Sequence, residues 1–317
     1  MSKSKYTAIG GQALIEGIMM KSPDKTAMAV RTKDGGIDIS EVLELNLRKK
    51  YKILALPIIR GVIAFAESMI NGYKALMLSA EKSGFTDFEE EGEEPLEEKK
   101  QGLLVSIVMV VGVVLGVILA LVLFTALPRY IVGGLETLFS TEFSYITRAL
   151  LEQALKMSVF VAYVWGVSFM KDIRRTFMYH GAEHKTIFCY EKGMELTVEN
   201  VRAQRRFHPR CGTSFMILMI LISVIISTIV QILFNGIYDN ALVWILIKIL
   251  LIPLTCGIGF EILKLCGKYD NILTRIISAP GLWLQRITTQ EPDDGMIEIA
   301  IAAFNACNIK ETEDDDI

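Results

Sequence analysis

Residues 102–127 read GLLVSIVMVVGVVLGVILALVLFTAL, an apolar stretch without a single ionisable side chain. About 20 apolar residues in a helix are enough to cross the hydrocarbon layer of a bilayer. The stretch therefore predicts a transmembrane helix that is closed by Pro128 and Arg129. The composition agrees, because 52% of the 317 residues are hydrophobic and only 22% are charged. We expect a mainly α-helical, polytopic membrane protein.

Three further apolar stretches follow, at residues 149–170, 215–234 and 241–260. The first of them carries Glu152, Gln153 and Lys156 near one end, and such groups must lie at the interface or face other helices. The other two follow each other closely and predict an antiparallel hairpin. The sequence thus predicts four membrane spans.

The distribution of cations predicts the orientation of these spans. The connection at 171–214 holds many more cations than either other connection: Lys171, Arg174, Arg175, Lys185, Lys192, Arg202, Arg205, Arg206 and Arg210. Connections rich in Lys and Arg face the cytoplasm. We therefore expect an inner-membrane-type protein with this connection and both termini in the cytoplasm. Five cysteines without a C-x-x-C pair fit a reducing compartment.

The first hundred residues have a different character. Residues 27–40, AMAVRTKDGGIDIS, alternate apolar and polar side chains around a Gly-Gly turn, which predicts a β-hairpin. Residues 53–80 are apolar with helical spacing but are interrupted by Pro, Gly and charged residues. This segment is either an interfacial or re-entrant helix or a helix packed on the cytoplasmic domain.

These patterns divide the chain into six segments. An N-terminal α+β region (1–86) with the hairpin and the amphipathic helix precedes an acidic linker (87–101). The first two spans (102–170), a cytoplasmic His/Cys loop (171–214), a transmembrane hairpin (215–260) and a C-terminal amphipathic region with an acidic tail (261–317) follow.

All three histidines of the chain lie within the predicted cytoplasmic loop. His180, Glu183 and His184 have the form H-x-x-E-H, and on a helix the two imidazoles share a face and can bind one metal ion. This is the order found in inverzincins, and Glu183 is a candidate general base acting on water at the metal. Gly181 weakens the helix that this arrangement requires.

His208 and Cys211 form a second pair just before the third span, with a proline between them. Both are good ligands for a borderline metal such as zinc. Alternatively, Cys211 is a nucleophile served by a histidine, because a helix N-terminus favours a thiolate. The plainest alternative is that the histidines contact lipid headgroups and no site exists. The clustering favours a metal site, whose predicted ligands are His180, His184, His208 and Cys211.

Two N-terminal segments carry carboxylates in apolar surroundings. Glu16 lies in GGQALIEGIMM, and Glu67 follows Arg60 in an apolar helical stretch. A buried carboxylate needs a partner, so Glu16 is expected to be a ligand or to pair with an arginine such as Arg60. Arg60 and Glu67 can also form a purely structural ion pair. We take Glu16, Arg60 and Glu67 as possible supporting residues.

Five segments carry a resemblance to a known family: residues 10–20 (GGQALIEGIMM), 60–68 (RGVIAFAES), 179–187 (YHGAEHKTI), 208–215 (HPRCGTSF) and 279–294 (APGLWLQRITTQEPDD). At these motifs the chain resembles the YqhQ-like bacterial membrane proteins, a family of unknown function often described as predicted metal-dependent enzymes. The resemblance implies a membrane location and a metal at positions 180, 184, 208 and 211. It implies no substrate.

These observations together predict a metal-dependent membrane enzyme, a hydrolase that acts at the cytoplasmic membrane surface with a divalent metal, Zn²⁺ or a similar ion, as cofactor. The expected partners are the lipid bilayer and its anionic headgroups, and no nucleic acid. The alternative is a non-catalytic scaffold or assembly factor with a structural metal, which a closed set of four ligands favours. A transporter is poorly supported, because the predicted spans carry few ionisable groups.

Overall fold

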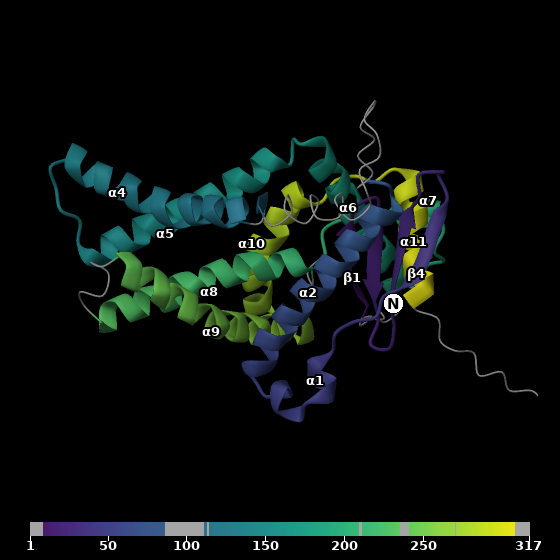
Figure 1. The fold of residues 1–317 in the computed structure, drawn as a ribbon, viewed down its shortest axis with the longest axis horizontal. Coiled ribbons are helices and arrows are strands. Elements are labelled where there is room, and N and C mark those ends of the chain that lie inside the picture. The colour runs from purple at the N-terminus through teal and green to yellow at the C-terminus, as the bar shows by residue number, and fades with distance from the viewer. Residues whose placement is uncertain are drawn as a thin grey trace, which may run out of the picture. The chain divides into compact units, whose positions relative to one another are not determined.

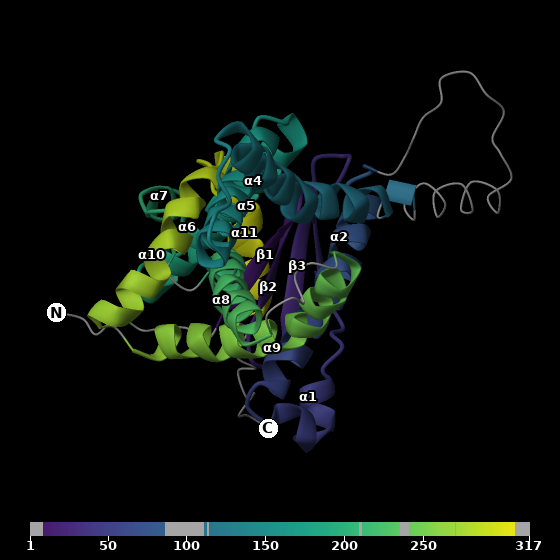
Figure 2. The same ribbon diagram turned by 90° about the vertical axis from the view of Figure 1, so that its left-hand side faces the viewer.

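The structure is a computed structural model that describes residues 9–85, 111–112, 114–208, 211–234, 241–269 and 271–307. The chain forms two compact units, one built from Met1–Asp87 and Gly166–Ile317, the other from Phe88–Trp165. Figures 1 and 2 show the elements of each unit. The described residues are mainly helical with one small sheet. The predicted acidic linker (87–101) lies entirely outside them.

The first unit begins with a four-stranded antiparallel sheet in the order β1-β2-β3-β4: β1 (Gly10–Leu14), β2 (Gly17–Lys21), β3 (Thr26–Arg31) and β4 (Ile37–Glu41). The predicted hairpin is confirmed, since β3 pairs with β4 and Gly35 takes a φ of 81° in the turn. The hairpin of β1 and β2 was not predicted. Strand β2 is buried at four successive positions, so its sequence GIMM lacks the alternation of a half-exposed strand.

Both faces of the sheet are covered, and the side chains divide between them with a period of two. Ile18, Met20 and Ala27 belong to a core that includes helices α6 (Lys171–Glu191) and α11 (Asp294–Cys307). Met19 and Met28 belong to a second core, which includes Ala75 of helix α2. Each buried Ile or Met side chain of these cores stabilises the fold by about 1.5–3 kcal/mol.

Helix α2 (Ile59–Lys82) occupies the segment for which the sequence left two alternatives. It follows the short elements α1 (Leu47–Lys50) and η1 (Lys52–Ala55), and it packs on the sheet through Ala75. At its other end Gly61 meets helix α9, where a Cβ would lie 2.9 Å from the Cα of Gly257. One face of α2 therefore packs on its own unit, while Phe65, Met69 and Tyr73 remain exposed.

Among the described residues, three helices are long and apolar enough to cross a membrane: Val114–Leu138, Ile146–Val167 and Leu246–Cys266. The sequence predicted that the first of these helices ends at Pro128. This prediction is wrong, because the helix continues to Leu138. Pro128 is tolerated since it follows a π-helical turn, η2 (Val122–Ala126), and lies in the first turn of α4 (Leu127–Leu138), where a missing N–H costs little.

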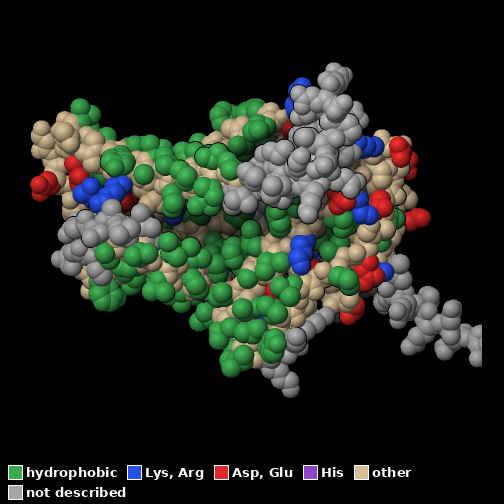
Figure 3. Space-filling view, viewed as in Figure 1, with side chains coloured by type: hydrophobic (Ala, Val, Ile, Leu, Met, Phe, Trp, Pro, Cys, Tyr) green, Lys and Arg blue, Asp and Glu red, His purple; other side chains and the backbone are tan. Residues whose placement is uncertain are grey.

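The second candidate span belongs to α5 (Tyr145–Val167) and the third to α9 (Ala241–Lys268). Helix α8 (Gly212–Leu233) contains a shorter apolar stretch, Phe215–Val230. The structure thus supports three of the four predicted spans by length and composition and gives a shorter apolar helix at the other. Hydrophobic side chains cover α8 and α9 in Figure 3.

The predicted His/Cys loop is largely helical, consisting of α6 and the short helix α7 (Val198–Arg202) with their connections. The C-terminal region forms α10 (Ile272–Thr288) and α11. Helix α10 begins with a capping box, in which the Asn271 side chain accepts from the Thr274 backbone N–H and the Thr274 hydroxyl accepts from the Asn271 backbone N–H. Figures 1 and 2 show that α10 crosses the direction of α8.

Candidate metal centre

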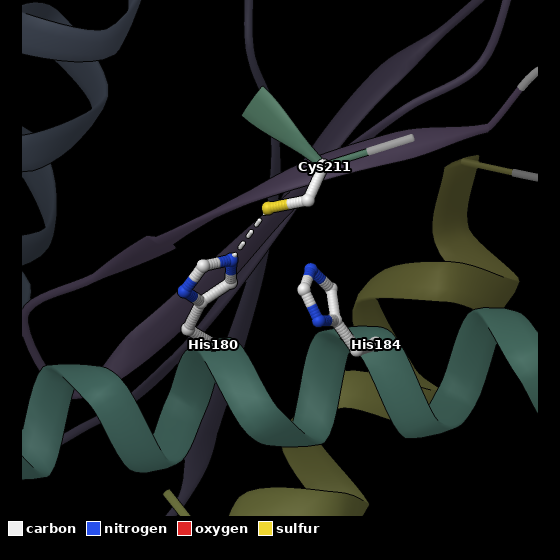
Figure 4. Close-up of side chains that lie close together, drawn as sticks. All are labelled: His180, His184 and Cys211. Carbon is white, nitrogen blue, oxygen red and sulfur yellow. Dashed lines mark hydrogen bonds between the residues drawn. The ribbon is translucent and has the colours of Figure 1, made fainter. Parts of the chain in front are cut away.

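His180 and His184 lie one turn apart on α6, as the spacing predicts. Their ring centroids lie 4.4 Å apart, and the ring planes are inclined to each other by 64°. Cys211 immediately precedes α8, and its Sγ lies 3.1 Å from the Nε2 of His180. One ligand atom from each of the three residues lies within 4.8 Å of the other two (Figure 4). The structure thus brings together three of the four predicted ligands.

Both imidazoles are oriented by backbone carbonyl groups. The Nδ1 of His180 lies 2.9 Å from the carbonyl oxygen of Thr288, and the Nδ1 of His184 lies 2.5 Å from that of Arg206. A carbonyl only accepts, so each Nδ1 carries the proton and each Nε2 keeps a lone pair. The Nε2 of His184 is buried and makes no hydrogen bond with any described residue. Histidines that bind metals commonly have this arrangement.

Burial keeps His184 in the form that binds a metal. Its side chain is only 1% exposed, and this burial lowers its pKa, while the negative charge of a Cys211 thiolate acts in the opposite direction. A neutral imidazole with a free lone pair is the state that coordinates a cation. The electrostatics of the pocket therefore agree with its geometry.

Gly181 has a structural role despite its low helix propensity. The backbone of Gln290 crosses α6 at this point, and a Cβ on Gly181 would lie 2.0 Å from the Gln290 carbonyl oxygen. The Gln290 N–H also donates to the carbonyl of Phe177, at 2.8 Å. Only glycine allows this approach, which brings the nearby Thr288 carbonyl to His180.

Glu183 lies beside the three ligands but not among them. Its carboxyl group packs on strand β1, where a Cβ on Gly11 would lie 2.9 Å from the Glu183 Cδ. Burial raises the pKa of Glu183, while the charge of His180 and a hydrogen bond from the Gly11 backbone lower it in part. Its Oε2 makes no hydrogen bond with the described residues. A buried carboxyl group with a raised pKa beside such a cluster is a candidate functional group.

His208, the fourth predicted ligand, is a neighbour of the cluster. Its ring centroid lies 5.7 Å from that of His184, and its Nε2 is 3.6 Å from a carboxylate oxygen of Glu191. Gln285 of α10 holds the His208 backbone, accepting from its N–H at 2.7 Å and donating to its carbonyl at 2.8 Å. Sequence reasoning did not single out either Glu191 or Gln285.

The three supporting residues lie in ion pairs outside the cluster. Glu16 does not pair with Arg60: it accepts a two-fold hydrogen bond from Arg175 and a further one, at 3.1 Å, from the hydroxyl of Tyr179. Arg60 pairs with Glu261 of α9, and Glu67 pairs with Arg48. Only the pair of Glu16 and Arg175 touches α6, one turn before His180.

The sequence also did not predict a network of ion pairs and hydrogen bonds next to His184. Buried Lys185 donates to the carbonyl of Arg202 at 2.9 Å and pairs with Glu291 at 2.8 Å. Glu291 also accepts from Arg206, whose carbonyl holds His184. Burial alone would raise the pKa of Glu291, but hydrogen bonds from Lys185 and Arg206 lower it on balance. The sequence feature that indicates this network is the opposite charge of two segments, the cationic stretch 202–206 and the acidic stretch 291–294.

Comparisons with known proteins agree with the resemblance. The family described as "Protein of unknown function (DUF1385)" matches residues 56–310. "Uncharacterized protein YqhQ" from Bacillus subtilis (strain 168) is 35% identical over 307 residues, which is 96% of this chain and 94% of that protein. No solved structure matches the chain. The chain belongs to the DUF1385 family, which includes the YqhQ-like proteins.

Proposed function

We propose that this DUF1385 protein is a metal-dependent membrane enzyme, a hydrolase that binds Zn²⁺ through His180, His184 and Cys211. One observation carries the proposal. Two imidazole nitrogens and one thiol sulfur lie within 4.8 Å of one another, and both histidines are oriented by backbone carbonyls. Nitrogen and sulfur ligands in this combination suit zinc.

The number of ligands favours catalysis over a structural role. Catalytic zinc sites typically use three protein ligands and keep one position open, whereas structural sites use four. A zinc ion with an open position lowers the pKa of a water molecule and polarises a carbonyl group. Glu183 is the proposed general base, because its buried carboxyl group has a raised pKa and lies within electrostatic range of His180.

The proposed setting is the cytoplasmic surface of a bacterial inner membrane. Three helices are long and apolar enough to span it, and the segment between the second and third predicted spans is rich in Lys and Arg. Such cations attract anionic headgroups by about 1 kcal/mol each. The substrate class that fits this setting is a lipid, a lipid-linked molecule or a segment of a membrane protein.

A second candidate is a scaffold or assembly factor with a structural metal. The observation that favours it is the position of His208, whose ring lies 5.7 Å from that of His184. If the His208 side chain rotates away from Glu191 and supplies a fourth ligand, the metal has four protein ligands and no open coordination position.

Metal analysis of purified variants tests the proposal. We expect stoichiometric zinc in the wild type and in His208→Ala, and loss of zinc in His184→Ala and Cys211→Ala. Cys266→Ala is the matched control, because Cys266 lies in α9 outside the cluster. Wild-type protein without zinc would exclude a zinc site, whereas loss of zinc in His208→Ala would favour the structural alternative. Glu183→Gln should retain zinc and abolish the cellular function; an unaffected phenotype argues against catalysis.

A further inference from the structure

We propose that α10 lies in the plane of the membrane–water interface, with its outer face in contact with lipid and its inner face holding the metal centre. The inference uses the membrane location from the proposed function and is independent of the metal. The bilayer surface is thus the proposed partner of a helix face that the fold leaves exposed.

The outer face of α10 is apolar and exposed. Ile272, Leu273 and Ile276 are 78%, 66% and 64% exposed, and Trp283 is 53% exposed. The spacing of 272, 276 and 283 places these side chains along one side of the helix. A contiguous apolar stripe of this kind marks a surface that is covered by a partner.

The inner face of α10 is buried and carries polar side chains beside the apolar Leu284, which is 1% exposed. Gln285 is completely buried and Thr288 is 6% exposed. Gln285 makes two hydrogen bonds with the backbone of His208, and the carbonyl of Thr288 accepts from His180. Polar groups inside and apolar groups outside are expected where the surroundings are lipid rather than water.

Three observations identify the bilayer surface as the occupant. Helix α10 begins four residues after the end of α9, which contains a candidate span, and it crosses the direction of α8 (Figures 1 and 2). Arg275 and Arg286 are exposed, each three residues after an apolar residue of the stripe, so they flank it. Cations beside an apolar face with a tryptophan are typical of helices at headgroup depth.

This position has a consequence for the proposed enzyme. Because α10 separates the lipid from His180 and His208, the metal centre lies one helix thickness from the headgroup region. An amphipathic substrate then reaches the centre by leaving the bilayer at α10, without crossing bulk water.

Fluorescence quenching of Trp283 by brominated phospholipids tests the inference. Wild-type protein and Trp283→Phe are reconstituted in nanodiscs whose acyl chains carry bromine at a shallow or a deep position, and the difference between them isolates Trp283. We expect the strongest quenching from the shallow bromine, since in-plane helices enter the bilayer by about 5–10 Å below the headgroups. Strongest quenching from the deep bromine, or no quenching at either depth, would overturn the proposal; the second result would mean that protein covers the stripe.

Two controls separate this inference from the proposed function. A variant that retains Trp244 alone (Trp165→Phe, Trp283→Phe) should be quenched weakly, because Trp244 is only 2% exposed. Zinc content is measured on the same samples. Shallow quenching of a protein without zinc would retain the position of α10 and reject the metal centre, while failure to enter nanodiscs would reject the membrane location and this inference together.

Discussion

The imidazole of His180 donates a hydrogen bond from Nδ1 to the carbonyl oxygen of Thr288 at 2.9 Å, although 108 positions of the chain separate them. This bond joins the helix that carries both histidines to the last turn of α10. The orientation of the proposed ligand therefore depends on a segment remote in sequence, and four predictions follow from contacts of this kind.

Gly181→Ala should weaken the metal centre without changing a ligand. A Cβ would lie 2.0 Å from the Gln290 carbonyl oxygen, so the crossing segment of residues 289–291 must move and carry the Thr288 carbonyl with it. We expect a loss of about 1–3 kcal/mol in the free energy of unfolding and about 10–100-fold in zinc affinity. Chelator competition and thermal unfolding measure the two effects. Gly134→Ala, where a Cβ meets open space inside α4, should leave zinc affinity unchanged and should lose no stability.

Gln285→Leu should destabilise the fold around His208. The substitution removes both side-chain hydrogen bonds to the His208 backbone in a fully buried position. Each buried group left without a partner costs about 1–3 kcal/mol. Denaturant unfolding in detergent should show the loss. Equal stability of the wild type and Gln285→Leu would contradict the role assigned to Gln285.

Glu291 should stabilise the protein at neutral pH and cease to do so in acid. Its pKa is lowered in the folded state, so its contribution is present above the unfolded value of about 4.3 and is lost as the pH falls through the folded value. Thermal unfolding of the wild type and Glu291→Gln should differ at pH 7 and converge in acid. Glu298→Gln, at an exposed position on α11, should match the wild type throughout. A difference that persists unchanged in acid would exclude the ion pairs as its source.

Cobalt substitution should reveal Cys211 as a ligand. Co²⁺ bound by a thiolate gives a charge-transfer absorption in the near ultraviolet, and Cys211 lies within 4.8 Å of both imidazole nitrogens. We expect this band in the Co²⁺ form of the wild type and of Cys266→Ala, and its loss in Cys211→Ser. Retention of visible d–d bands with no thiolate band in the wild type would mean that nitrogen and oxygen ligands alone hold the ion.

Local patterns predicted the parts of the site that depend on local geometry. The spacing of His180 and His184 gave their shared face on a helix, and the apolar run after Cys211 gave its place before α8. The alternation around Gly35 gave the hairpin of β3 and β4. In each case the physical cause, a helical or extended repeat, acts over a few residues.

Other parts of the fold depend on contacts between distant segments, and those were not predicted. Strand β2 is covered on both faces, so the alternation that would mark it is absent. The partner of Glu16 is Arg175 rather than Arg60, and the choice depends on how α6 packs on the sheet. His208 lies next to Glu191 because Gln285 holds its backbone from 77 positions away. No short pattern encodes such pairings.

The first unit is built from two separate parts of the chain, and this arrangement constrains the order in which the protein can fold. Its sheet is made early in synthesis, but α6 and α11, which share a core with Ile18, Met20 and Ala27, follow the whole inserted unit Phe88–Trp165. This apolar strand face therefore stays uncovered until the ribosome has made almost the entire chain. Such a nascent sheet is prone to aggregation and depends on chaperones or on rapid docking of the late helices.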